Sequence, residues 1–296
     1  EKIDVSKDKI LLTIAKTIAH AATVHNATTY LMEKKPDWDF MAVYHDAIDH
    51  FSHACMRFHP PQLKGIPDKE YNLFKNVINA GYMFHDMMLE RTLELAGEDT
   101  TVILLSDHGM PLPYAKSTVY ENGLRVPFMI RLPNGFKAGT RNIKDLVSAI
   151  DIAPTVLDML NINIPSHFEG TSFNPKSANK SRKYVFGQFD ENAGGIPRPS
   201  RTVINKKYGY VFNAWATGKY EFKSASGSHT SYKAMKKLAE ADVEVKKRFD
   251  HWKFREVEEL YDYENDPNAL KNLIYDPKYK EVVKELRTAL EKQMKP

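Results

Sequence analysis

The chain has 296 residues, with 42 Lys and Arg against 38 Asp and Glu and therefore a net charge of +4. Apolar residues make up 42% and charged residues 27%, which are values of a globular protein and exclude a disordered, collagen-like or low-complexity chain. A charge of +4 over this length is too dilute to favour nucleic acid as a partner, and no apolar run approaches the roughly 18 residues that a membrane span needs.

The first part of the chain is predicted to alternate long helices with short buried strands. The opening to about Glu33 contains good helix formers, and Pro36 ends this helix. Apolar residues spaced three and four apart predict a second long helix over residues 68–97, and the sequence at 151–154 opens a third. The strands are short and apolar along their whole length, and we expect them at residues 39–44, 101–106 and 127–132.

Strands that alternate with helices in this way predict an α/β domain with a mostly parallel sheet covered by helices. After residue 175 the sequence changes in character. Short aromatic-rich strands are expected at 183–189, 201–205 and 208–214, and they suggest a small antiparallel sheet. A final helix begins at Asp276-Pro277, a capping residue followed by proline. We therefore divide the chain into an α/β core, residues 1–175, and a smaller α+β subdomain, residues 176–296.

An acidic residue and a histidine lie side by side directly after the predicted strand at 101–106. In an open parallel sheet, ligands bind beyond the carboxyl ends of the strands. Asp107 and His108 would offer one oxygen and one nitrogen ligand there, and Gly109 allows the backbone to turn sharply behind them. The alternative is an ordinary turn, in which Asp107 caps the following segment and His108 is only exposed.

A second acidic–histidine pair follows the predicted strand at 39–44. Asp49 and His53 are four residues apart, so one helical turn would place both on one face, where they suit a divalent cation such as zinc. The alternative, and the more frequent arrangement for a single pair, is a hydrogen bond between the two side chains on a helix surface. Because both pairs lie at strand ends, together they would supply four ligands for one or two cations that polarise an anionic ester.

Two further side chains could take part in chemistry. Lys116 lies a few residues beyond Asp107-His108, where it could neutralise an oxyanion substrate as a point charge; the alternative is a solvated lysine. Cys55 is the single cysteine, which excludes an internal disulfide. We expect it to be a buried, inert thiol rather than a nucleophile.

Several spaced motifs resemble the sulfatase family of the alkaline phosphatase superfamily, in the order that the family has them. They cover roughly residues 101–296 and lie at 106–110, 116, 120–127, 151–158, 169–172, 259–262, 266–267 and 272–273. The stretch at 110–116 is most similar to the heparan N-sulfatase-type branch. The resemblance implies an alkaline-phosphatase-like α/β fold and a sulfated sugar as substrate.

The first hundred residues resemble another branch of the same superfamily. The segments at 37–40 and 49–53 are similar to those of type I phosphodiesterases and nucleotide pyrophosphatases. That branch implies two zinc ions, one bound by Asp49 and His53 and the other by Asp107 and His108. The sulfatase branch instead implies one calcium ion at Asp107 and His108, with Lys116 in contact with the sulfate. We therefore class Lys116 and His108 as catalytic and both acidic–histidine pairs as metal ligands.

Both branches carry features that this sequence lacks. The early acidic pair and the Cys-x-Pro-Ser-Arg motif of sulfatases are absent, as are the early Asp and the Thr or Ser nucleophile of the phosphodiesterases. We therefore expect the N-terminal part of the fold to be missing from this chain. The family is often exported, which implies a periplasmic or extracellular location, although no export signal is visible.

The leading hypothesis is a sulfatase-type, metal-dependent hydrolase of sulfate esters or N-sulfate groups whose nucleophile lies outside this chain. One alternative is a two-zinc phosphodiesterase or phosphatase. The other is an inactive fragment that binds a metal or an anion.

Overall fold

The computed structural model describes residues 7–143, 145–175, 182–192 and 194–295. The chain forms two compact units. The first unit comprises Glu1–Leu105 and Pro127–Ala138, and the second unit comprises Ser106–Val126 and Gly139–Pro296. The division of the chain at residue 175 stays a prediction.

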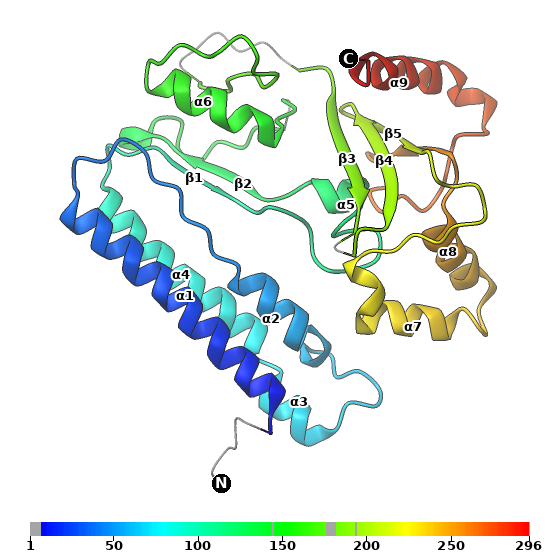
Figure 1. The fold of residues 1–296 in the computed structure, drawn as a ribbon, viewed down its shortest axis with the longest axis horizontal. Helices are drawn as coiled ribbons and strands as arrows, with labels where there is room; N and C mark the ends of the chain where they lie inside the picture. Colours follow the sequence, from blue (N-terminus) through cyan, green and yellow to red (C-terminus); the bar gives the residue numbers. More distant parts are fainter. Residues whose placement is uncertain (1–6, 144, 176–181, 193, 296) are drawn as a thin grey trace. The chain divides into compact units, whose positions relative to one another are not determined.

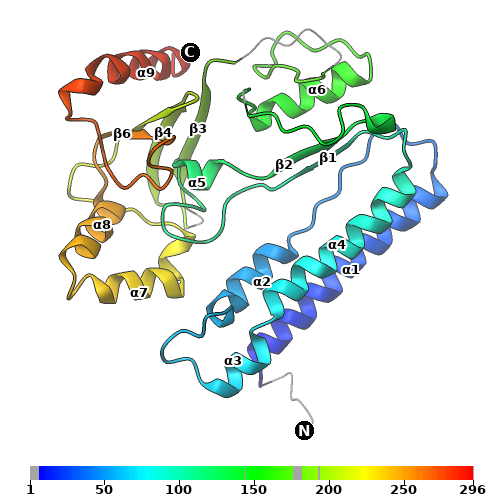
Figure 2. The same ribbon diagram turned by 180° about the vertical axis from the view of Figure 1, so that it is seen from behind.

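The first unit is built on a bundle of helices. Its helical segments are α1 (Lys9–Lys34), α2 (Ala47–Cys55), η1 (Met56–Phe58), α3 (Asp68–Phe74) and α4 (Val77–Ala96). The Asp8 carboxylate caps α1 by accepting hydrogen bonds of 3.0 Å from the backbone N–H groups of Ile10 and Leu11. Helices α1, α2 and α4 lie side by side (Figures 1 and 2) and enclose a core that includes Ala21, Phe51 and Met88.

A two-stranded ribbon completes the regular structure described in this unit. Strands β1 (Val102–Leu105) and β2 (Phe128–Arg131) pair antiparallel, and the turn η2 (Pro133–Gly135) follows them. Apolar side chains of the ribbon remain open to solvent, with 38% of Leu104, 41% of Leu105 and 56% of Met129 exposed. The ribbon therefore buries only part of the apolar surface that its sequence carries.

The second unit contains a four-stranded sheet with the order β3-β4-β5-β6, in which all neighbours are antiparallel. Its strands are β3 (Val185–Glu191), β4 (Pro197–Ile204), β5 (Tyr208–Asn213) and β6 (Glu258–Asp262). Its helices are α5 (Glu121–Leu124), α6 (Ile152–Met159), α7 (Thr230–Leu238), α8 (Val243–Phe254) and α9 (Lys280–Gln293), with short turns at η3 (Ala149–Asp151), η4 (Ala225–Ser228) and η5 (Pro277–Tyr279).

The two faces of this sheet have separate cores because successive side chains of a strand point to opposite faces. Tyr210 and Leu260 pack with the apolar residues of α9, which include Leu286. Their neighbours Val211 and Tyr261 belong to an aromatic cluster on the other face, and this cluster extends to the segment 114–120 and to α8. The sheet therefore anchors both the final helix and the segment that carries Lys116.

Asp151 ties two of the motifs noted in the sequence together. Its carboxylate is 3% exposed and accepts hydrogen bonds from the backbone N–H of Ser148 at 2.8 Å and of Thr171 at 2.7 Å, as well as from Arg182. A carboxylate with this many donors is a structural element of the α6 region, and it fixes residues 169–172 against the start of that helix.

The mixed α/β class is confirmed, but three details of the predicted fold are wrong. Residues 39–44 lie outside any strand. The strand pairs in the described part of the chain are antiparallel rather than mostly parallel. The helix expected over 68–97 is interrupted between α3 and α4, at Lys75 and Asn76. Apolar periodicity predicts an element but not its pairing partner, and pairing decides both the direction of a strand and whether it forms.

Helices in the described residues are either too short or too polar to cross a lipid bilayer.

Candidate functional site

The Asp107–His108 pair directly follows β1 and is held by local hydrogen bonds. The Nδ1 atom of His108 lies 2.9 Å from the carbonyl oxygen of Gly109, and the hydroxyl of Ser106 donates to the carbonyl of His108 at 3.1 Å. A ring nitrogen that faces a carbonyl carries the hydrogen, which places the lone pair of the neutral imidazole on Nε2. This Nε2 atom is 3.5 Å from Oδ2 of Asp107.

The loop behind this pair needs glycine at two places. A Cβ atom on Gly109 would lie 2.1 Å from the carbonyl oxygen of Asn122, and one on Gly123 would lie 2.5 Å from the carbonyl oxygen of Ala115. A side chain does not fit at either distance. The motifs at 106–110 and 120–127 therefore interlock through their backbones, and this contact fixes the position of the Asp107–His108 turn within the second unit.

Lys116 lies in the same interlocked loop and is half-buried. Its backbone N–H donates to the carbonyl of Met110 at 3.0 Å, and the hydroxyl of Ser226 donates to the carbonyl of Leu112 at 3.1 Å. Two residues beside it, Tyr114 and Ser117, have positive φ angles of 65° and 61°. The backbone around Lys116 is thus bent twice and held from both sides.

Asp49 and His53 meet on α2, as their four-residue spacing predicts. Oδ2 of Asp49 and Nε2 of His53 are 3.3 Å apart, and 29% and 32% of the two side chains are exposed. The carboxylate of the neighbouring Asp46 lies 3.2 Å from Nδ1 of His20 and 3.2 Å from Nε2 of His50. The histidine-rich stretch therefore contains two separate acidic–histidine groups on the surface of the first unit.

Each candidate pair has the donor types and spacing of two adjacent metal ligands. Two ligands about 2.0–2.4 Å from one cation and about 90–110° apart are separated by roughly 2.8–3.9 Å, and the two pairs measure 3.3 and 3.5 Å. The residues described here contain no group of three or more His, Cys, Asp or Glu side chains arranged for a metal ion. Asp49 and His53 belong to the first unit and Asp107 and His108 to the second. Each pair thus fits a divalent cation as part of a coordination shell, and a shared site stays a prediction.

Cys55 is fully buried in the helical core of the first unit. Burial raises the pKa of its thiol to about 11, against a smaller opposing effect of Arg57. A thiol with this pKa carries almost no thiolate near neutral pH, so the residue is inert in the folded protein.

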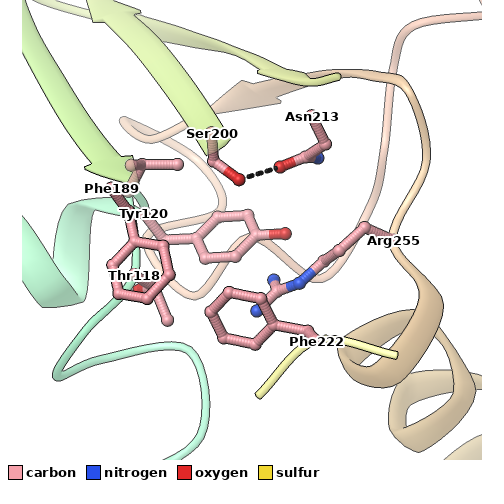
Figure 3. A pocket seen from close by; sticks show the side chains of 8 residues that line it. Thr118, Tyr120, Phe189, Ser200, Asn213, Phe222 and Arg255 are labelled. Carbon is pink, nitrogen blue, oxygen red and sulfur yellow. Dashed lines mark hydrogen bonds between the residues drawn. The ribbon is translucent and has the colours of Figure 1, made fainter. Parts of the chain in front are cut away.

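A small cavity in the second unit is lined by the buried guanidinium of Arg255, which the sequence did not reveal (Figure 3). Its walls include Thr118, Tyr120, Phe189, Ser200, Asn213, Phe222 and Arg255. The guanidinium carbon of Arg255 lies 4.5 Å from the ring centre of Phe222 and 4.7 Å from that of Tyr120, distances typical of cation–π contacts. The enclosed space is about 10 Å³, the room for one water molecule. It is therefore too small for a sugar sulfate, and none of the candidate ligands lines it.

One wall residue of this cavity, Tyr120, contacts a motif that is far away in the sequence. The hydroxyl of Tyr120 donates to the buried carboxylate of Glu259 at 2.7 Å. Both residues belong to the motifs that carry the sulfatase resemblance, which is the signal by which the sequence could have identified them. Their separation along the chain does not reveal that the two side chains are in contact.

Known proteins resemble the chain over most of its length. The profile of the Sulfatase family matches residues 8–162, more than half of the chain, and that described as "N-sulphoglucosamine sulphohydrolase, C-terminal" matches residues 107–222. An ulvan-active sulfatase of Formosa agariphila is 30% identical, over 79% of this chain and 40% of that protein. The human N-sulphoglucosamine sulphohydrolase is 27% identical, over 66% of this chain and 41% of that protein.

Solved structures agree on the fold. A structure of a 2-O GAG sulfatase, BT1596, superposes with a TM-score of 0.54 at 19% identity and covers 84% of this chain and 46% of that one. A sulfatase structure from Bacteroides thetaiotaomicron gives a TM-score of 0.53 at 20% identity, over 82% of this chain and 46% of that one. The chain thus spans less than half the length of these relatives. The family match begins at residue 8, so it also includes the segment that resembles the phosphodiesterase branch. The chain belongs to the sulfatase family.

Proposed function

We propose that this chain is part of a metal-dependent hydrolase that removes sulfate from sulfate esters or N-sulfate groups of sugars. The observation that carries the proposal is the interlocked loop at 106–124, which holds Asp107, His108 and Lys116 within a chain of the sulfatase family. Carboxylate, imidazole and ammonium groups together suit a divalent cation beside an oxyanion.

The residues take separate roles in this proposal. Asp107 and His108 hold the cation, with Nε2 of His108 presented by the hydrogen bond of Nδ1 to Gly109. The cation, when bound, supplies positive charge that polarises the sulfate group. Lys116 contacts a non-reacting sulfate oxygen as a point charge, so that the negative charge is balanced when the S–O or S–N bond breaks.

The substrate class is proposed from the relatives. Their names include ulvan-active, N-sulphoglucosamine, hexuronate-2-O and N-acetylglucosamine-6-O sulfatases or sulphohydrolases. These substrates share a sulfated sugar and differ in the position of the sulfate. A sulfated mono- or oligosaccharide is therefore the substrate we propose.

Calcium is the cation that we propose for this activity, on the implication of the sulfatase resemblance. The second candidate function is a two-zinc phosphodiesterase. It is favoured by the Asp49–His53 geometry on α2, because a carboxylate oxygen and an imidazole nitrogen 3.3 Å apart suit zinc.

The test is to assay the polypeptide encoded by the whole gene, and this chain beside it, on sulfated glucosamines and on bis(p-nitrophenyl) phosphate. Ion chromatography measures released sulfate, and absorbance measures nitrophenolate. We expect sulfate release from the sugars, with Lys116→Ala lowering the rate at least tenfold. Cleavage of the phosphodiester without sulfate release would replace the first proposal by the second.

A further inference from the structure

The backbone beside Lys116 is held in a conformation that ordinary residues avoid. Tyr114 and Ser117 both lie in the left-handed region, with φ angles of 65° and 61°. Non-glycine residues persist there only when the surrounding structure fixes them, and such strain gathers at functional sites. Two groups of contacts hold this loop.

The first group holds Tyr114, whose side chain is almost fully buried. Its hydroxyl lies 2.9 Å from the carbonyl oxygen of Arg248 and 2.8 Å from Nδ1 of His251, both on α8. The hydroxyl has one hydrogen, so donation to the carbonyl leaves a lone pair that accepts from the Nδ1–H of His251. The guanidinium of Arg248 lies 3.4 Å above the ring centre, and the ring of His251 is parallel to it. The tyrosine is thus fixed in both its hydroxyl and its ring.

The second group holds Tyr120, on the far side of Lys116. Its hydroxyl donates to Oε2 of Glu259 on β6 at 2.7 Å. Glu259 is fully buried and also accepts from Tyr261 at 2.6 Å and from Nδ2 of Asn213 at 2.7 Å. A buried carboxylate with this many donors has little freedom to move.

One histidine connects the two groups. While Nδ1 of His251 faces Tyr114, its Nε2 lies 3.4 Å from Oε2 of Glu259. The guanidinium of Arg255 packs against both tyrosine rings, 5.1 Å from the ring centre of Tyr114 and 4.7 Å from that of Tyr120. We call His251, Arg255 and Glu259 the α8–β6 clamp.

We propose that the α8–β6 clamp positions Lys116 for contact with the sulfate, by fixing Tyr114 and Tyr120 on either side of it. This inference rests on the proposed function, because only that function gives Lys116 a sulfate to contact. The three clamp residues are positioning residues and do not touch the substrate. They lie beyond residues 8–162 and 107–222, which the two family profiles match.

The test compares Tyr114→Phe with Tyr210→Phe in this chain. Both substitutions delete one phenolic hydroxyl from a hydrogen bond in the second unit, but the hydroxyl of Tyr210 donates to Glu258 on the other face of the sheet. Tyr210→Phe therefore reports the general cost of losing such a hydroxyl. Urea unfolding of both variants checks that they remain folded and are destabilised to a similar extent.

The first readout is hydrogen exchange of the Lys116 amide, which donates to the carbonyl of Met110 in the wild type. Its signal is assigned in a ¹⁵N correlation spectrum through Lys116→Arg. We expect exchange at least tenfold faster in Tyr114→Phe and unchanged in Tyr210→Phe. Equal exchange in the two variants overturns the positioning role.

The second readout is a titration of the same signal with inorganic sulfate. We expect the dissociation constant to rise at least fivefold in Tyr114→Phe and to stay constant in Tyr210→Phe; an unchanged constant in both overturns the clamp's role in binding. If sulfate leaves the wild-type signal unmoved, the proposed function loses its support, and the exchange measurement still decides whether the clamp holds the loop.

Discussion

A Cβ atom built on Gly109 would lie 2.1 Å from the carbonyl oxygen of Asn122, so these two residues touch through their backbones. Gly109→Ala must push the Asp107–His108 turn away from the 120–127 segment. We expect the free energy of unfolding to fall by about 1–3 kcal/mol or more, as for overpacked cores. Urea denaturation measures this change. Gly227→Ala is the control, because its Cβ would meet only Trp252 at 3.9 Å; equal midpoints for the two variants would contradict the interlocked loop.

Metal binding should depend on the Asp107–His108 pair. Asp107→Asn removes the charge of the proposed oxygen ligand and His108→Ala removes the proposed nitrogen ligand, so we expect at least a tenfold loss of affinity for the cation in each. Calorimetric titration with calcium and with zinc measures the affinity and the number of ions bound. Asp190→Asn is the control because it also removes one carboxylate charge, but from a residue that forms an ion pair with Arg201 of β4 at 2.6 Å and is not a proposed metal ligand.

The same titrations distinguish the two candidate functions. One calcium ion that is lost with Asp107→Asn supports the sulfatase. Two zinc ions, one of them lost with His53→Ala, support the phosphodiesterase. Affinity that survives Asp107→Asn and His108→Ala unchanged means that neither side chain is a ligand.

Glu259 should make the protein sensitive to acid. Burial alone would raise the pKa of this carboxyl, but hydrogen bonding and attraction from His251, with further contributions from Arg255 and Tyr261, lower it from 4.5 to about 2. A lowered folded-state pKa stabilises the fold above pH 4.5, and this contribution is lost as the pH falls towards 2. Wild-type stability measured by urea denaturation should therefore fall between pH 5 and pH 2.

Glu259→Gln tests the origin of that loss. The substitution removes the buried negative charge that lies 3.4 Å from His251 and attracts Arg255, so we expect a cost of about 3–5 kcal/mol at pH 7 and a weaker dependence on pH below 5. Glu264→Gln is the control, since Glu264 is a largely exposed partner of Lys207. Parallel loss of stability in wild type and Glu259→Gln below pH 5 would show that another group titrates.

The thiol of Cys55 should react only after unfolding. Its complete burial and a pKa of about 11 leave almost no accessible thiolate at pH 8. We expect labelling with Ellman's reagent to be at least a hundredfold slower in the native protein than in guanidinium chloride. Fast labelling of the native protein would reopen its interpretation as a nucleophile.

Elements with strong local signals were predictable from the sequence. The final helix is one: a cap at Asp276 and apolar residues at helical spacing predict it, and α9 indeed packs Val283, Leu286 and Leu290 on the sheet. The contact between Asp49 and His53 is another, because both residues lie within one helical turn. Local geometry decides both features.

Features that depend on distant contacts were not predictable in the same way. Strand β6 was missed because its acidic residues Glu258, Glu259 and Asp262 are typical of a protein surface. The strand pairs with β5, and the hydrogen-bond donors to Glu259 come from distant segments of the chain. The segment 39–44 was wrongly predicted as a strand, because a run of apolar residues does not specify a neighbouring strand with which it can pair. The buried guanidinium of Arg255 was likewise not predictable, because the residues that line its cavity come from distant parts of the chain.

The β1–β2 ribbon affects how the chain behaves when handled. Leu104, Leu105 and Met129 are open to water, and in the described residues each of the two strands pairs only with the other. A short two-stranded ribbon with exposed apolar side chains is a surface to which further strands can add. Light scattering of concentrated solutions should therefore rise with time, and charged substitutions at Met129 should slow that rise.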